Sequence, residues 1–232
     1  MGGKQISVTK YRDGKCWLED DLVAEEITIR IFTNKVPFGT LVCSPWNLEE
    51  LVIGYLCIEG VIHSYKDILN VEIINDSVNV TYKVELPEAT AKEKTVPPVL
   101  RSSDVVNLIQ ELDQRSEIFR QTGGVHNAAV SDGKVIITNT EDVSRHNALD
   151  RLVGRCLMQG ISLQNKVIVF SGRVPEEIIS GVAYLKCSAI ISVSAPTSKA
   201  IEIAEKNNVM LICFARGNRF NVYTCSERLI NE

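Results

Sequence analysis

The first third of the chain alternates between apolar and polar residues, and one helical stripe interrupts the alternation. Ile27, Ile29 and Ile31 fall on one face of an extended segment, which predicts a half-buried strand. The elements expected here are strands over 26–33 and near 36–43, a helix from Ser44-Pro45 to Gly60, and a hairpin over 71–74 and 78–84. We therefore expect a small α+β unit over residues 1–98, ending in a linker at 87–98 that contains three prolines.

The remainder of the chain changes from one long helix to an alternation of strands and helices. A helix is expected from about Asp104 to Phe119 with Phe119 facing inward, and Asp132-Gly133 predicts a hairpin. Strands at 166–170, 189–193, 209–214 and near 220–224 then alternate with helices at 175–186 and 198–207. This order predicts an α/β domain over residues 99–232, with a parallel or mostly parallel sheet covered on both faces.

Three loops follow the strands of this predicted sheet. They read Ser171-Gly172-Arg173, Ser194-Ala195-Pro196-Thr197 and Ala215-Arg216-Gly217-Asn218-Arg219. In an open α/β sheet such loops lie at the carboxyl ends of the strands, where ligands bind. The forked donors of Arg173, Arg216 and Arg219 suit phosphate, so we expect a phosphate-bearing ligand such as a nucleotide. The chain contains neither a Walker loop nor G-x-G-x-x-G.

Residues 121–150 are the densest polar stretch of the chain. Gly123-Gly124 is expected to leave backbone amides open to a ligand, because no side chain shields them. His146 and Asn147 are expected in the first turn of a helix, where unpaired amides favour an anionic or polar ligand. These observations favour a binding site over simple helix capping. The candidate residues are Thr122, Gly123, Gly124, His126, Asp142, Arg145, His146 and Asn147.

Composition narrows the class of protein. The net charge of −4 argues against a general nucleic-acid binder, and no apolar run approaches the length of a membrane span. A cytoplasmic protein is the simplest interpretation. The cysteines are Cys16, Cys43, Cys57, Cys156, Cys187, Cys213 and Cys225, and they never form Cys-x-x-Cys. They predict neither a disulfide framework nor a metal site, and Cys225 is the one expected to be accessible.

Six stretches, taken together, resemble the formate dehydrogenase accessory family FdhD/NarQ. They are SPWNLEELVIGYLCIEGVI (44–62), TGGVHNAAV (122–130), EDVSRHNALD (141–150), SGRVPEEII (171–179), SAPTSKAIEIAE (194–205) and FARGNRFNVYT (214–224). The resemblance covers the chain from about residue 25 to its end. It implies a cytidine-deaminase-like three-layer α/β/α domain behind a small N-terminal unit, assembled as a homodimer.

The resemblance also implies a function. Members of this family are sulfurtransferase-type carriers. They pass sulfur from a cysteine desulfurase to the molybdenum bis(molybdopterin guanine dinucleotide) cofactor before its insertion into formate dehydrogenase. The family's cofactor-binding loop matches Phe214, Ala215, Arg216, Gly217, Asn218 and Arg219. We expect this loop to hold the GDP-like part of the cofactor, with the histidines of residues 121–150 shaping the pocket.

The chain departs from the family at two places. Ser144 stands where the family has glycine. The family's sulfur-carrying Cys-x-x-Cys falls at about 86–103, and this chain has no cysteine between Cys57 and Cys156. A persulfide carrier needs an accessible thiolate, so sulfur transfer cannot run from the usual position. We therefore assign no catalytic residue. Cys225 is the candidate thiol for carrying sulfur from another position.

One alternative function belongs to a different class. A zinc deaminase is excluded, because it needs His-x-Glu and Pro-Cys-x-x-Cys and the chain has neither. A metal-free nucleotide hydrolase could use His126, His146 and Asp142 as acid and base. Turnover of a nucleotide would favour the hydrolase, and tight binding without turnover would favour the accessory protein.

Overall fold

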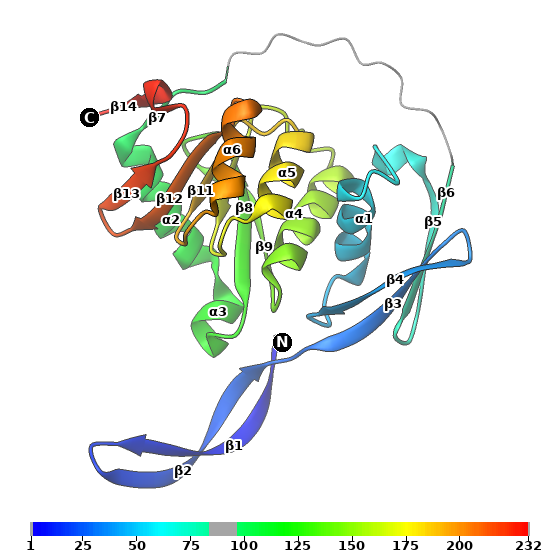
Figure 1. Cartoon of the computed structure of the whole chain (residues 1–232). Helices are drawn as coiled ribbons and strands as arrows, with labels where there is room; N and C mark the ends of the chain where they lie inside the picture. Colours follow the sequence, from blue (N-terminus) through cyan, green and yellow to red (C-terminus); the bar gives the residue numbers. More distant parts are fainter. Residues whose placement is uncertain (1, 84–96, 232) are drawn as a thin grey trace.

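The chain begins with a long two-stranded arm. A computed structural model describes residues 2–83 and 97–231. Strands β1 (Gly3–Arg12) and β2 (Lys15–Ala24) pair along their whole length, and Asp13 and Gly14 make the turn with φ of 51° and 79°. The arm projects away from the body of the protein (Figure 1). The apolar pattern predicts no element here, because most of the arm is exposed on both faces and no buried face gives a period of two.

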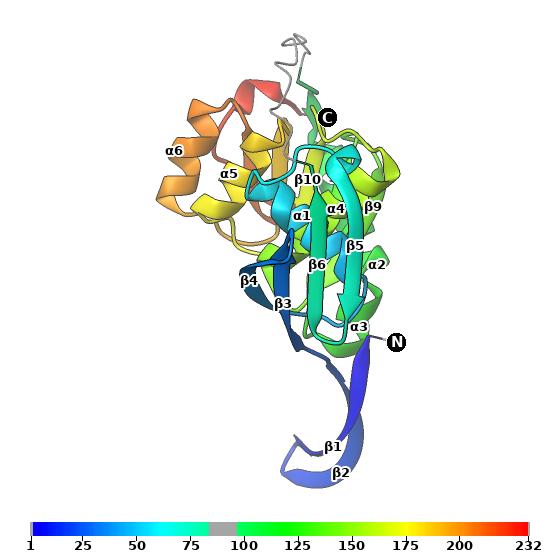
Figure 2. The same ribbon diagram turned by 90° about the vertical axis from the view of Figure 1, so that its right-hand side faces the viewer.

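The first unit has the predicted α+β content. Its elements are β3 (Ile27–Thr33), β4 (Val36–Cys43), α1 (Leu48–Ile58), the short 3-10 helix η1 (Tyr65–Asp67), β5 (Ile68–Ile74) and β6 (Ser77–Tyr82). The strands form a sheet of order β4-β3-β6-β5, which faces the viewer in Figure 2 with α1 behind it. Ile29 and Ile31 are buried, as their alternation predicts.

The second unit is built on a six-stranded sheet. Its elements are β7 (Leu100–Arg101), α2 (Ser102–Arg115), α3 (Glu117–Thr122), β8 (His126–Ser131), β9 (Ile136–Asp142), α4 (Arg145–Gln159), β10 (Val167–Phe170), α5 (Glu176–Tyr184), β11 (Ala189–Ser192), α6 (Ser198–Lys206), β12 (Met210–Arg216), β13 (Arg219–Val222), η2 (Ser226–Arg228) and β14 (Leu229–Ile230). The sheet order is β13-β12-β11-β10-β8-β9. The predicted hairpin at Asp132-Gly133 is confirmed as the β8–β9 connection.

The prediction of a mostly parallel sheet is wrong for the sheet as a whole. Only β10–β11 and β11–β12 are parallel pairs, and β8, β9 and β13 join the sheet antiparallel. The reason is connection length. A helix separates β10, β11 and β12 from one another and allows parallel crossovers, whereas the short turns beside β9 and β13 force antiparallel hairpins.

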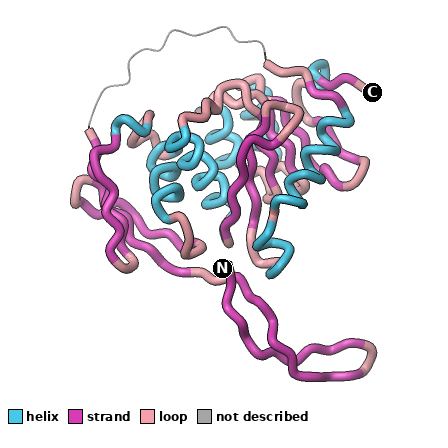
Figure 3. The backbone as a smooth tube through the Cα atoms, turned by 180° about the vertical axis from the view of Figure 1, so that it is seen from behind, coloured by secondary structure: helices cyan, strands magenta, loops and turns pink. Residues whose placement is uncertain are grey.

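Helices cover both faces of this sheet, as predicted. One buried apolar cluster joins α1, α4, α5 and α6 to one face, and a second joins α2 to the other. Figure 3, viewed from behind, shows α2 running across the face opposite to α4 and α5. The first cluster also contains the sheet of the first unit, because α1 packs on α4. The division at residues 98 and 99 stays a prediction, and most of the expected linker at 87–98 lies outside the described residues.

The expected helix over residues 104–119 is interrupted. Ser116 lies between α2 and α3 with ψ of 76°, and its hydroxyl donates to the carbonyl of Leu112 at 2.6 Å. The interruption turns α3 away from the direction of α2. As a result Phe119, which was expected to face inward, is 39% exposed.

Candidate cofactor-binding site

Three loops meet at one edge of the six-stranded sheet. Because β10, β11 and β12 are parallel, the loops after them share the edge formed by their carboxyl ends, as predicted. Backbone hydrogen bonds join the loops: Val174 N–H donates to Ala195 O at 3.0 Å, and Phe214 N–H donates to Ser194 O at 3.0 Å. The loops therefore form one continuous backbone surface.

The start of β8 brings His126 to the same edge. Because β8 runs antiparallel to β10, its first residues lie beside the loop that follows β10. The backbone N–H of Asn127 donates to Ser171 Oγ at 2.8 Å, and His126 Nδ1 lies 3.3 Å from the same oxygen. The first turn of α4 is also close, since a Cβ atom on Gly172 would lie 2.8 Å from Arg145 Cβ. Glycine at position 172 therefore permits this approach.

The two histidines of the edge are held in the neutral form. Burial lowers the pKa of His126, and the Arg145 charge lowers it further. Burial also lowers the pKa of His146, again with help from Arg145. At neutral pH the imidazoles are therefore uncharged donors and acceptors, while Arg145 supplies positive charge.

Several buried polar atoms at this edge have no hydrogen-bond partner. Within the described residues five such side-chain atoms occur, and three of them are Asn127 Oδ1, Arg145 Nε and His146 Nε2. Native proteins pair nearly all buried polar atoms, and unpaired ones call for an explanation. A polar ligand at this edge would supply the missing partners.

The arginine loop is a tight hairpin between β12 and β13. Arg216 pairs with Arg219 across the turn Gly217-Asn218, and Gly217 has a φ of 56°. Arg216 Nε donates to Val193 O at 2.9 Å, which ties the hairpin to the loop after β11. Phe214 is 41% exposed and has a φ of 55°, a conformation that is uncommon for a bulky residue and costs energy.

Asp142 and Asn147 have structural partners and do not line the surface of the site. The Asp142 carboxylate is fully buried and accepts hydrogen bonds from Ser44 N, Ser144 N, Asn147 Nδ2 and Arg151 Nε. Asn147 also donates to Val42 O at 2.7 Å. In the structure these two residues hold the start of α4 from behind, and their expected part in shaping the cofactor pocket stays a prediction. Carboxylate and amide groups before a helix give the same sequence signal in either role.

The Thr-Gly-Gly segment also departs from expectation. Its two glycine amides are not open to a ligand, because Gly123 N donates to Phe119 O at 2.7 Å and Gly124 N donates to Thr122 Oγ1 at 3.1 Å. Gly123 ends α3 with a φ of 66°, the usual glycine stop. A Cβ atom on Gly124 would lie 2.8 Å from the Ala24 Cβ atom, so glycine here allows close packing against the end of β2.

The remaining predicted residues have positions consistent with a surface site. Arg173, Phe214, Arg216, Gly217, Asn218 and Arg219 are exposed, and Ser171, Ser194, Ala195 and Pro196 are partly buried. Thr197 has a defined local role, since its hydroxyl accepts from Ala200 N at 3.2 Å and caps α6. Phosphate binding by the arginines stays a prediction.

The structure reverses the expected order of cysteine accessibility. Cys16, on the arm, is exposed, whereas Cys225 is partly buried and its Sγ lies 3.3 Å from Asn208 Oδ1. Burial raises the pKa of Cys225. The other five cysteines are buried in the core, and burial raises the pKa of Cys213, for example, to about 12. Cys225 is therefore not the most accessible thiol.

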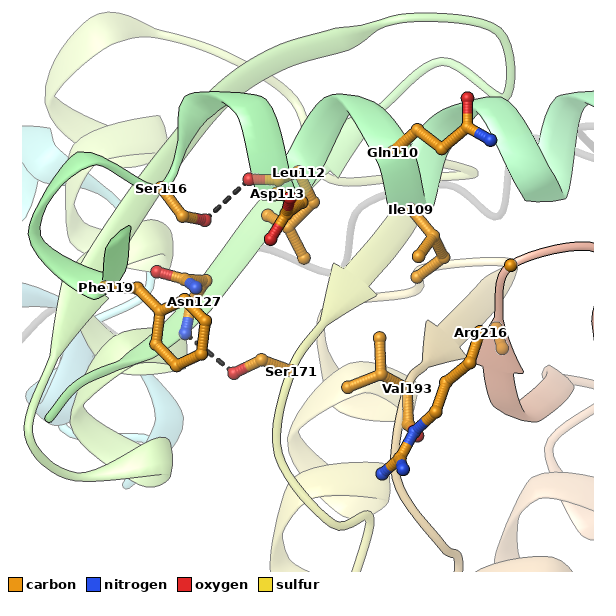
Figure 4. A pocket seen from close by; sticks show the side chains of 12 residues that line it. Ile109, Gln110, Leu112, Asp113, Ser116, Phe119, Asn127, Ser171, Val193 and Arg216 are labelled. Atoms are coloured by element: carbon orange, nitrogen blue, oxygen red, sulfur yellow. Dashed lines mark hydrogen bonds between the residues drawn. The ribbon is translucent and has the colours of Figure 1, made fainter. Parts of the chain in front are cut away.

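A cavity beside the arginine hairpin includes residues that the sequence did not single out. Its volume is about 290 Å³, and it lies between α2, α3 and the ends of β8, β10 and β12 (Figure 4). Asp113, Ser116 and Phe119 line it together with Asn127 and Arg216. In the sequence, Asp113 and Ser116 belong to a polar Asp-Gln-Arg-Ser run at 113–116, which marks the end of α2.

Two further observations concern ligands and membranes. Across residues 2–83 and 97–231, no group of three or more His, Cys, Asp or Glu side chains could hold a metal ion. None of the described helices combines the length and the apolar character needed to cross a membrane.

The fold and the edge define the class of protein: a mixed α/β protein with a candidate polar ligand site at the carboxyl ends of three parallel strands. Comparison with known proteins gives the family. The profile of the FdhD/NarQ family matches residues 24–103 and 84–230. The chain belongs to this family.

Similar proteins agree with this assignment over nearly the whole chain. The sulfur carrier protein FdhD of Bacillus licheniformis is 36% identical over 260 residues, covering 98% of each chain. That of Staphylococcus aureus strain Newman is 35% identical over 254 residues, covering 97% of this chain and 95% of the relative. A crystal structure described as a formate dehydrogenase accessory protein from Desulfotalea psychrophila superposes with a TM-score of 0.85 at 24% identity, covering 99% of this chain and 100% of that one. This structure confirms the fold.

Proposed function

We propose that this protein binds the molybdenum bis(molybdopterin guanine dinucleotide) cofactor during formate dehydrogenase maturation. The observation that carries the proposal is the unpaired buried Oδ1 of Asn127, which lines the same cavity as Arg216 and Gly217 of the arginine hairpin. The residues fit such a group because they combine unpaired polar atoms with cationic donors. The cofactor supplies the redox chemistry of the client enzyme, and this chain supplies binding and orientation.

The roles within the site follow from position and charge. Arg216 and Arg219 lie on the exposed hairpin and Arg173 in the loop after β10, so these three would hold phosphates. His126 and His146 are neutral and would exchange hydrogen bonds with uncharged parts of the ligand. We also propose that the protein forms a homodimer and has a cysteine desulfurase as a partner. We propose a cytidine-deaminase-like fold for the six-stranded domain, and the layer of helices on each face of its sheet supports this class.

The binding proposal is tested by calorimetry with GDP. Replacing Arg216 and Arg219 together by alanine removes two charge-assisted contacts, so GDP affinity should fall about 100-fold or more. Replacing Arg30 and Lys199 by alanine is the matched control, because both are exposed and both are paired elsewhere on the surface. Equal GDP affinity in the arginine variant and the wild type would refute phosphate binding by the hairpin.

The positions of His126 and Asp142 give no support to the alternative function as a nucleotide hydrolase. His126 and Asp142 are opposite each other in the β8–β9 ladder, but the Asp142 carboxylate is bonded to Arg151, Asn147 and two backbone amides. An acid–base pair between them would need that carboxylate to be free to orient the imidazole. We expect purified protein to bind GDP or GTP without releasing phosphate.

Sulfur loading is a separate question, because the usual Cys-x-x-Cys is absent. Incubation with a cysteine desulfurase and labelled cysteine, followed by release with a thiol reductant, measures whether the chain carries persulfide sulfur. We expect no reductant-released label on Cys225, since its thiol is partly buried and its pKa is raised. A label that disappears in Cys225→Ser would contradict this expectation and restore Cys225 as a carrier.

A further inference from the structure

A second cavity lies where α1, α4 and α5 meet. Its volume is about 210 Å³, and it shares no lining residue with the cavity beside the arginine hairpin. The three helices are neighbours in Figure 1. They approach closely at Gly181 of α5, where an added Cβ atom would lie 3.8 Å from Ile58 of α1 and 3.9 Å from Leu149 of α4.

The charged side chains of this cavity are acidic. Glu59 follows the last turn of α1 and Glu177 lies in the first turn of α5, and both are exposed. Asp150 of α4 also lines the cavity and is only 7% exposed. Among the described residues around the cavity, none is a lysine or an arginine. A cleft of one sign with apolar walls concentrates ions of the opposite sign, so the cavity favours a cation.

Two buried groups of the cavity have no partner. Within residues 2–83 and 97–231, the Asp150 carboxyl makes no hydrogen bond or ion pair, and His146 Nε2 is buried and unpaired. These side chains are four residues apart on α4 and therefore lie on the same face of the helix. The neutral imidazole of His146 can present Nε2 as an acceptor. A ligand with N–H donors would satisfy both groups.

The rest of the lining limits the kind of cation. Tyr55, Ile58, Leu149 and Ile178 contribute apolar surface, which suits a hydrocarbon stem. The volume is below the usual range for small-molecule sites, about 300–1,000 Å³, so the stem is short. A metal ion lacks a ligand set here, because the described residues contain no group of three or more His, Cys, Asp or Glu side chains that could hold one.

We infer that this cavity binds a primary alkylammonium group, with Asp150 as its counter-ion and His146 Nε2 as a second acceptor. An ammonium has three donors, which leaves one for Glu59 or Glu177 at the exposed side of the cavity. A free amine and a lysine side chain of a partner protein present this same chemistry. The inference goes beyond the proposed function, because none of these acidic residues belongs to the set proposed for phosphate binding.

The state of Asp150 gives the binding a distinct signature. Burial raises the pKa of its carboxyl, and the charges of Glu59 and Asp142 raise it further. The titratable groups that line the cavity around it are Tyr55, Glu59, His146 and Glu177. When the ammonium binds, the Asp150 O–H bond breaks, the proton passes to the buffer, and the carboxylate accepts an N–H of the ligand. Binding near pH 5 should therefore release up to one proton for each ammonium bound.

Calorimetry of the full chain with n-butylammonium tests the inference. The wild type should bind it saturably with a Kd on the order of 1 mM, and n-butanol, which has no charge, about 10-fold more weakly or less. Asp150→Asn keeps the shape of the side chain and should lower n-butylammonium affinity about 10- to 100-fold. Glu177→Gln, an exposed change that does not threaten folding, should lower it about 2- to 5-fold. Glu202→Gln on α6 is the matched control and should keep the wild-type affinity.

Two further measurements complete the test. Titrations near pH 5 in buffers of different ionisation enthalpy should show proton release in the wild type and none in Asp150→Asn. Nα-acetyl-lysine amide that binds at least as tightly as n-butylammonium would identify a partner's lysine as the source of the group, and weaker binding would identify a free amine. The inference is overturned if the wild type does not bind n-butylammonium, binds n-butanol equally well, or keeps its n-butylammonium affinity in Asp150→Asn.

Discussion

The carboxylate of Asp142 and the guanidinium of Arg151 form a fully buried ion pair, with 2.7 Å between Oδ2 and Nε. Both partners also bond to the segment between β4 and α1: Asp142 accepts from Ser44 N at 3.2 Å, and Arg151 donates to Ser44 O at 2.6 Å. Arg151 donates to the Trp46 carbonyl as well. The pair therefore joins the first unit to the start of α4, where Arg145 and His146 enter the site.

Breaking this pair should destabilise the protein strongly. Asp142→Asn keeps the shape of the side chain but leaves the buried Arg151 charge unpaired, and such changes cost about 3–5 kcal/mol in the free energy of unfolding. Equilibrium unfolding in urea measures the loss. Glu202→Gln breaks an exposed pair with Lys199 and should leave the free energy of unfolding almost unchanged, because solvent screens exposed ion pairs. Similar losses in both variants would mean that the Asp142–Arg151 pair is solvated.

The sequence predicts the elements with a clear period and misses those without one. The buried strands were predicted correctly, because burial on one face imposes a repeat on the residues. The arm of residues 3–24 was missed, because it is exposed on both sides. Antiparallel pairing of β8 to β10 was missed, because the pattern of a strand does not reveal its neighbour.

The sequence predicts which loops meet at one edge of the sheet, but it does not distinguish polar residues that serve the fold from polar residues that contact a ligand. The arginine hairpin and Ser171 lie at one edge because strand direction alone determines which ends meet. Asp142 was assigned to the pocket because a carboxylate that supports a helix start and one that contacts a ligand look alike in a sequence. Phe119 was missed as a residue of the cavity, because its position depends on the break between α2 and α3 at Ser116.

Close contact between α1 and α4 requires glycine at position 54. A Cβ atom on Gly54 would lie 1.7 Å from the Asp150 carbonyl oxygen, which no relaxation of a side chain can relieve. Gly54→Ala should therefore separate the two helices and destabilise the protein by at least about 3 kcal/mol, a loss typical of a disrupted core. Thermal unfolding followed by circular dichroism measures it.

Gly181→Ala is the matched control for this prediction. Gly181 is also a buried helical glycine, but its added Cβ would lie 3.8 Å or more from its neighbours, in ordinary contact. Because alanine is the better helix former by about 0.5–1 kcal/mol, this variant should be neutral or slightly more stable. Equal destabilisation by the two variants would refute the close approach of α1 and α4.

Thiol reactivity should distinguish Cys16 from the other cysteines. Cys16 is exposed on the arm, five cysteines are buried, and Cys225 is partly buried. Native protein treated with a thiol-specific disulfide reagent should show one rapid equivalent, which Cys16→Ser removes and Cys225→Ser leaves in place. A rapid phase that persists in Cys16→Ser would contradict the accessibility described for the arm.

The last prediction concerns Asp150, whose carboxyl group is buried against α1. Burial raises its pKa well above the ordinary value of 3.8, and the charges of Glu59 and Asp142 raise it further. A carboxyl whose pKa is raised in the folded state binds its proton more tightly there than in the unfolded chain. Its stabilising effect is therefore complete below pH 3.8 and is lost as the pH rises toward the raised value.

Asp150→Asn removes this titration and should make the variant progressively more stable than the wild type as the pH rises. The difference in the free energy of unfolding between variant and wild type, followed through Tm, should grow as the pH is raised from pH 5, by no more than about 1.4 kcal/mol per pH unit. Asp76→Asn is the control. The pKa of Asp76 is lowered by a hydrogen bond from Arg30, so its titration lies below pH 3.8 and its Tm difference should stay flat over this range. A flat difference for Asp150→Asn as well would show that the Asp150 carboxyl is ionised throughout, and its burial against α1 would then have to be revised.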